Sequence, residues 1–137
     1  MRSVYEPWAA RCAAARRTEE ELHALEAAFA DMAAGVATGK PDDPAVIDAD
    51  LRFHSTLLTA TRKEFMGRLG ALIVPALRLR NEITLSHADR IDFLPLHEAV
   101  LEAVRAQDAR LAEDSMRTLL EVSARDSASA DHSERPA

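Results

Sequence analysis

The chain has little of several residue types, and each scarcity excludes a class of protein. Its 137 residues include a single cysteine, Cys12, so no disulfide can form within one chain, and we expect a reducing compartment. Only four glycines occur, and an apolar fraction of 47% made mostly of Ala and Leu favours helices. No apolar run approaches the roughly 20 residues that cross a bilayer, and no secretory apolar core follows Met1. We therefore expect a soluble cytoplasmic protein without a membrane partner.

Basic residues are scattered along the chain and form no block. The 17 Lys and Arg residues are outnumbered by 23 Asp and Glu residues, which gives a formal net charge of −6. Nonspecific affinity for DNA depends largely on the number of cations that face the phosphates. The chain alone is therefore predicted to bind nucleic acid poorly.

The apolar residues recur with a helical period nearly throughout, and no segment shows the alternation of a strand. The sequence predicts an all-α fold, an antiparallel bundle of about six helices joined by short turns. The predicted helices cover about residues 6–17, 18–36, 43–61, 64–87, 92–105 and 108–124. Pro75 is expected to kink the fourth of them, and residues 125–137 are predicted to form a disordered tail.

Local signals mark several of the predicted helix starts. Thr18 and Glu21 match a capping box. Asp42 or Asp43 is expected to cap the third helix, because Pro44 suits a first helical turn. Asp108 is predicted to cap the sixth helix in the same way.

Several polar residues fall on predicted apolar faces. Asp50 and His54 are four residues apart, so they lie one turn apart on the same face of the third helix, among its apolar residues. His97 lies near the centre of the apolar arc of the fifth helix, and Arg80 and His87 lie within that of the fourth. A buried carboxylate is costly unless it is paired or binds a metal. These side chains are therefore predicted to meet inside the bundle.

The combination of Asp50, His54 and His97 suits a divalent metal ion. Imidazole and carboxylate are good ligands for Zn²⁺, and three protein ligands leave one coordination position open. Arg80 could then neutralise the carboxylate of a small organic acid held at that position. This pattern predicts a metal-assisted binding site for a small acid.

Other interpretations remain open for the same residues. Asp50 could form a buried ion pair with Arg80 while His54 donates to a backbone carbonyl, and His97 could be an ordinary, partly buried histidine. His87 could simply complement the dipole at a helix end. The domain would then be a metal-free dimerisation or interaction module with a structural polar network. A metal-dependent hydrolase is the remaining alternative, but no separate general base accompanies the site, so we predict that the chain is not an enzyme.

Three segments resemble the FCD domain, the C-terminal effector-binding domain of FadR-subfamily GntR transcription regulators. Residues 50–54, Asp-Leu-Arg-Phe-His, resemble its Asp-x-x-Phe-His signature. Residues 6–22 resemble the first helix of that domain and the start of its second helix. Residues 97–108 resemble a segment of that domain in which a histidine is followed by aliphatic pairs and then by an aspartate. The likeness covers residues 6–122 and implies an FCD-like domain over residues 6–124.

The resemblance also implies a ligand set. Metal-dependent members of the family hold a divalent ion with one Asp and three His, and Asp50, His54 and His97 match the first three. Leu119 stands where the family usually has the fourth ligand, so the set is incomplete. Leu119, Arg80 and His87 are therefore taken as candidate contacts of the effector.

A regulator of this family senses a small molecule and passes the signal to DNA. The resemblance implies a homodimer that binds a small organic acid and controls an N-terminal winged helix-turn-helix. Nothing before Glu6 can supply such a DNA-binding domain, so contact with DNA is expected only through a part that this chain lacks.

Overall fold

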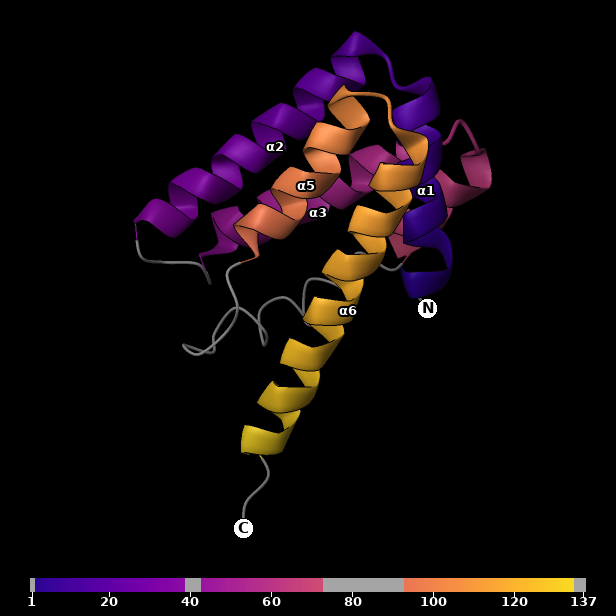
Figure 1. Ribbon diagram of the computed structural model, residues 1–137. Coiled ribbons are helices and arrows are strands. Elements are labelled where there is room, and N and C mark those ends of the chain that lie inside the picture. Colours follow the sequence, from indigo (N-terminus) through magenta and orange to yellow (C-terminus); the bar gives the residue numbers. More distant parts are fainter. Residues whose placement is uncertain (1, 39–42, 73–92, 135–137) are drawn as a thin grey trace.

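The computed structural model describes residues 2–38, 43–72 and 93–134, with side chains as far as residue 125, and all regular structure in these ranges is helical (Figure 1). This confirms the prediction of an all-α fold. The helices are α1 (Arg2–Arg16), α2 (Glu19–Ala37), α3 (Pro44–Thr59), α5 (Leu94–Arg105) and α6 (Ala109–Glu134). Residues 64–72 are also helical.

The predicted caps are present. The Thr18 hydroxyl accepts a hydrogen bond from the Glu21 backbone N–H, and the Glu21 carboxylate accepts one from the Thr18 N–H, both at 3.1 Å. Asp43 caps α3 by accepting from Ala45 N–H at 2.8 Å. Asp108 accepts from Leu111 N–H at 3.0 Å at the start of α6. These bonds satisfy amide groups that have no partner inside the helices, so the helix starts are fixed locally.

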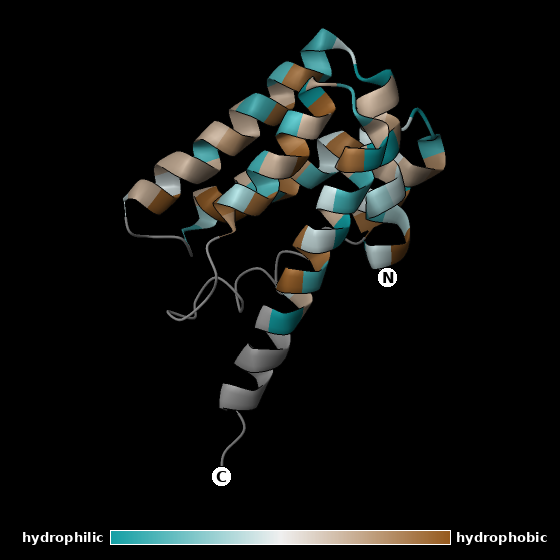
Figure 2. Ribbon diagram, in the orientation of Figure 1, coloured by the Kyte–Doolittle hydropathy of each residue, from teal (hydrophilic) through white to brown (hydrophobic). Residues whose placement is uncertain are grey.

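The helices pack through one main core. Helix α1 packs against α6, α2 against α3, and α5 against α6, while α1 also contacts α3 and α5. Figure 2 shows apolar and polar residues interleaved along the coloured parts of the helices, as expected for amphipathic helices. Large side chains fill the interior, among them Phe53, Leu25, Met32 and Met116, whereas α1 contributes small ones, Ala10, Ala13 and Ala14. Small residues on α1 allow its close approach to its neighbours.

Gly35 has a packing role near the end of α2. A Cβ atom at this position would overlap Cγ2 of Val46, a buried residue of α3. The glycine therefore permits the close contact between α2 and α3, in addition to weakening the helix end.

Two predicted boundaries were wrong. Helix α1 begins at Arg2 and not at Glu6, because Arg2 forms an i,i+4 ion pair with Glu6 that supports the first turn. Helix α6 continues to Glu134, ten residues beyond its predicted end, so the backbone of residues 125–134 is helical and not the predicted disordered tail. No glycine or proline interrupts residues 125–134, so nothing in the local sequence ends the helix there.

Among residues 2–38, 43–72 and 93–134, none of the helices combines the length and apolar character that a membrane span requires.

Candidate functional site

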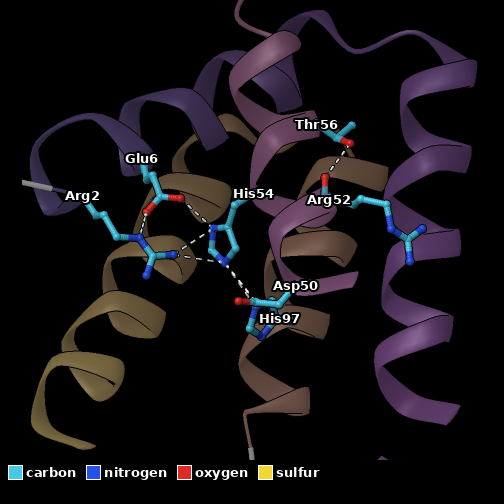
Figure 3. Close-up of polar contacts among 7 residues, drawn as sticks. All are labelled: Arg2, Glu6, Asp50, Arg52, His54, Thr56 and His97. Carbon is cyan, nitrogen blue, oxygen red and sulfur yellow. Dashed lines mark hydrogen bonds and ion pairs between the residues drawn. The ribbon is translucent and has the colours of Figure 1, made fainter. Parts of the chain in front are cut away.

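Three buried polar side chains from α3 and α5 meet in the interior (Figure 3). Nε2 of His97 lies 2.8 Å from Oδ1 of Asp50 and 3.3 Å from Nε2 of His54. Nε2 of His54 lies 3.3 Å from the same Asp50 oxygen. The structure thus brings together the three residues that the sequence predicted as metal ligands, with one donor atom of each within 4.8 Å of the others.

Aromatic rings hold the two imidazoles in place. The Phe53 ring packs edge-on against His54 and His97, with centroid distances of 5.8 and 5.1 Å. Phe93 packs in the same way against His97 at 5.5 Å. Phe53 is fully buried in the main core, so the orientation of both imidazoles depends on core packing.

In both histidines, Nδ1 faces an oxygen acceptor. Nδ1 of His97 donates to the backbone carbonyl of Phe93 at 3.0 Å. Nδ1 of His54 lies 2.7 Å from Oε1 of Glu6 and donates to that carboxylate. With a hydrogen on Nδ1, each Nε2 is turned toward Asp50. Metal-binding histidines are usually held by this arrangement of an acceptor behind the ring.

Sequence reasoning missed two members of the site, Arg2 and Glu6 of α1. Nε of Arg2 donates to Oε2 of Glu6 at 2.6 Å, and its Nη2 lies 3.4 Å from each ring nitrogen of His54. Glu6 is 2% exposed and shares a helical face with the buried Ala9 and Ala13. That position on an apolar face was the available signal, and it is the same signal that identified Asp50.

The charges in the cluster stabilise one another. Burial opposes the ionisation of Glu6, but His54 and Arg2 outweigh it and lower the Glu6 pKa to about 2. Burial would likewise lower the His54 pKa, yet the carboxylates of Glu6 and Asp50 raise it to about 9. The pKa of Asp50 is well below its ordinary value, because attraction and hydrogen bonds from His54 and His97 exceed the cost of burial. Without a metal, His54 is therefore protonated at neutral pH between two carboxylates.

The donor set fits a divalent metal ion. One carboxylate oxygen and two imidazole nitrogens converge from two helices, and Zn²⁺ is commonly held by three protein ligands of these types. Each imidazole donates its Nδ1 hydrogen to an oxygen acceptor, so Nε2 is the nitrogen that could bind a metal. Asp50, His54 and His97 are the residues that would hold the ion.

The remaining predicted site residues are Leu119, Arg80 and His87. Leu119 is 1% exposed and belongs to the main core with Phe53, so it offers no donor to a metal. Arg80, His87 and the predicted kink at Pro75 lie outside the described residues. The interpretation in which His54 donates to a backbone carbonyl was wrong, because its Nδ1 meets the Glu6 carboxylate instead.

The described helices form a bundle with a buried polar cluster in its interior. The family model of the FCD domain matches residues 1–122 of this chain. The chain therefore belongs to the FCD domain family, which confirms the resemblance found in the sequence.

The chain is similar to two proteins whose names refer to a transcriptional repressor and to GntR. The galactonate operon transcriptional repressor of Escherichia coli (strain K12) is 31% identical over 127 residues, which cover 91% of this chain and 54% of the repressor. The solved structure of Streptococcus agalactiae GntR is 27% identical with a TM-score of 0.76, over 90% of this chain and 55% of that protein. The chain spans about half the length of both relatives. By its name the Escherichia coli relative is a repressor of transcription, which agrees with the prediction that this chain is not an enzyme.

Proposed function

We propose that this FCD domain senses a small organic acid and thereby controls DNA binding by a winged helix-turn-helix outside this chain. The buried cluster of Asp50, His54 and His97 is the observation that carries the proposal. Burying a carboxylate and two imidazoles costs more than an apolar core of the same size. A ligand that uses these groups gives a reason for their presence.

A divalent ion, with Zn²⁺ as the first choice, is proposed to bind Asp50 Oδ1 and the Nε2 atoms of His54 and His97. When bound, it would supply a fixed positive charge with an open position for a carboxylate oxygen. Because Leu119 gives no fourth protein ligand, that position is left for water or for the effector. The site would thus bind metal and acid together.

The proposed effector is a hydroxy acid of the sugar-acid class. The name of the Escherichia coli relative refers to galactonate, a polyhydroxy carboxylate. The guanidinium of Arg2 lies beside His54 and adds a cation that attracts a carboxylate. Arg80 and His87 remain proposed contacts of the effector, although they lie outside the described residues.

The proposed regulator works as a homodimer in the cytoplasm. Effector binding would favour one packing of the helices over another and so change the relative placement of the two DNA-reading domains. Binding of a dimer to two half-sites requires a fixed spacing between those domains. A change in that spacing would therefore alter affinity for the operator.

Calorimetric titration tests the proposal. Zn²⁺ and then galactonate are added to the wild type, to Asp50→Ala and to Asp48→Ala, a control on the same helix whose side chain is exposed. We expect the wild type and Asp48→Ala to bind both ligands, and Asp50→Ala to lose zinc affinity by about 100-fold or more. If the wild type binds neither a divalent metal nor any organic acid, the sensor function is wrong.

The second candidate is a metal-free dimerisation or interaction module. One observation favours it: the protonated His54 already bridges Glu6 and Asp50, so the polar network is satisfied without an ion. Such a network would fix how α1, α3 and α5 pack. In that case Asp50→Ala would weaken dimerisation or stability, and zinc would leave the wild-type Tm unchanged.

A further inference from the structure

We propose that Glu6 is a positioning residue that holds His54 ready for metal binding and connects the first turn of α1 to the site. The inference rests on the proposed metal site. Glu6 is 2% exposed, and both of its carboxylate oxygens are used: Oε1 lies 2.7 Å from Nδ1 of His54 and Oε2 lies 2.6 Å from Nε of Arg2 (Figure 3).

The contact selects one form of the imidazole. A neutral histidine carries its hydrogen on Nδ1 or on Nε2, and only the first form leaves the Nε2 lone pair free to bind a metal. A carboxylate acceptor at Nδ1 stabilises that form, fixes the ring orientation and makes the ligand more basic. Glu6 therefore favours the form in which His54 Nε2 can act together with Asp50 and His97.

The two histidines depend on different parts of the structure. The acceptor of His97 is the carbonyl of Phe93, four residues earlier in the same segment. The acceptor of His54 comes from α1, 48 residues away in sequence. Only His54 therefore has its Nδ1 acceptor on another helix, and α1 provides that acceptor.

The same carboxylate also holds the N-terminal turn of α1. Arg2 is bound to Glu6 and lies 3.4 Å from the imidazole of His54. An ion that draws His54 toward Asp50 would act on Glu6, and through Glu6 on Arg2. Occupancy of the site is therefore linked to order in the opening turn of the domain.

Zinc affinity of three variants tests this role. Glu6→Ala removes the acceptor, and Glu6→Gln keeps an oxygen acceptor without the charge. Glu113→Ala is the control, since Glu113 also binds an arginine of α1, Arg11 at 2.9 Å, but from α6 at the surface. Measured by chelator competition, Glu6→Ala should bind Zn²⁺ about 10- to 100-fold more weakly. Glu6→Gln should recover most of the loss, and Glu113→Ala should match the wild type.

A second measurement separates positioning from general stability. Long-range ¹H–¹⁵N spectra of the zinc-loaded wild type should show His54 with hydrogen on Nδ1 and metal on Nε2. In Glu6→Ala the His54 ring signals should shift or broaden, while those of His97 stay in place. If Glu6→Ala does not fold, as judged by its circular dichroism, the comparison of Glu6→Gln with the wild type in the same spectra decides.

Failure of the Glu6 role and failure of the metal site give different results. If the wild type and Glu6→Ala bind zinc equally well, or if His97 is disturbed as much as His54, Glu6 has no positioning role and the metal site itself stands. If the wild type binds no zinc, both the metal site and the role of Glu6 are wrong.

Discussion

Nδ1 of His54 lies 2.7 Å from Oε1 of Glu6, although the two residues are 48 positions apart and belong to α3 and α1. This contact makes the site a junction of three helices, because Asp50 comes with His54 on α3 and His97 comes from α5. It also sets the charge of the site before any ion binds, since His54 is protonated between two carboxylates.

Binding of zinc should release a proton near neutral pH. The pKa of His54 is about 9 in the metal-free domain, but Nε2 must be free of hydrogen to bind a metal. At pH 7 we expect about one proton released per ion, and an apparent affinity that rises about tenfold per pH unit up to pH 9. Calorimetry in buffers of different ionisation enthalpy measures the number of protons. Zinc binding at pH 7 without proton release would contradict the charge state of His54.

The metal-free domain should be most stable in mildly acidic solution. The pKa of Glu6 falls from 4.5 to about 2 on folding, so its contribution is present above pH 4.5 and is lost as pH falls toward 2. The pKa of His54 rises from 6.5 to about 9, so its contribution is complete below pH 6.5 and is lost as pH rises through 9.

Urea unfolding over a pH series tests this dependence. The free energy of unfolding should be largest between about pH 4.5 and 6.5 and should decrease on both sides. Glu6→Gln should flatten the acidic side in part, because it removes one of the two buried carboxylates, Glu6 and Asp50, whose pKa values are lowered. An acidic side as steep in Glu6→Gln as in the wild type would mean that other carboxylates are responsible.

Leu119→His should strengthen zinc binding. By the resemblance to the FCD domain, Leu119 is expected at the position of the fourth metal ligand, and it is buried with Phe53 in the main core. An imidazole there should raise zinc affinity tenfold or more, while the metal-free domain loses about 2–4 kcal/mol of stability because a polar ring replaces a core leucine. Leu120→His, at the next core position, is the matched control. Equal zinc affinity in the two variants would show that position 119 does not face the ion.

Gly35→Ala should destabilise the contact between α2 and α3. The added Cβ atom would overlap Val46 Cγ2, so we expect a loss of about 1–3 kcal/mol. Gly67→Ala is the control, because no atom lies within 4 Å of a Cβ built there and alanine favours a helix. Thermal unfolding should show a lower Tm for Gly35→Ala, restored in part by Val46→Ala, and an unchanged or higher Tm for Gly67→Ala. A Gly35→Ala variant as stable as the wild type would show that the helices separate at little cost.

The buried polar cluster was predictable because helical periodicity alone puts Asp50, His54 and His97 on buried faces. Glu6 met the same test, since it shares a face with Ala9 and Ala13, but the predicted helix began at Glu6 and excluded Arg2. The pairing of Glu6 with His54 was not predictable from periodicity, because it depends on how α1 crosses α3 in space. The end of α6 was missed for another reason: Ser, Ala and Asp are compatible with both a helix and a disordered tail.

The two histidines differ in what must be in place before Nδ1 has its acceptor. His97 has its Nδ1 acceptor on its own segment, so the formation of α5 places that acceptor next to the ring. His54 is prepared only after α1 has docked. A domain in which α1 has separated from α3 would therefore retain the proposed ion poorly, and binding of that ion would depend on the packing of α1 against α3.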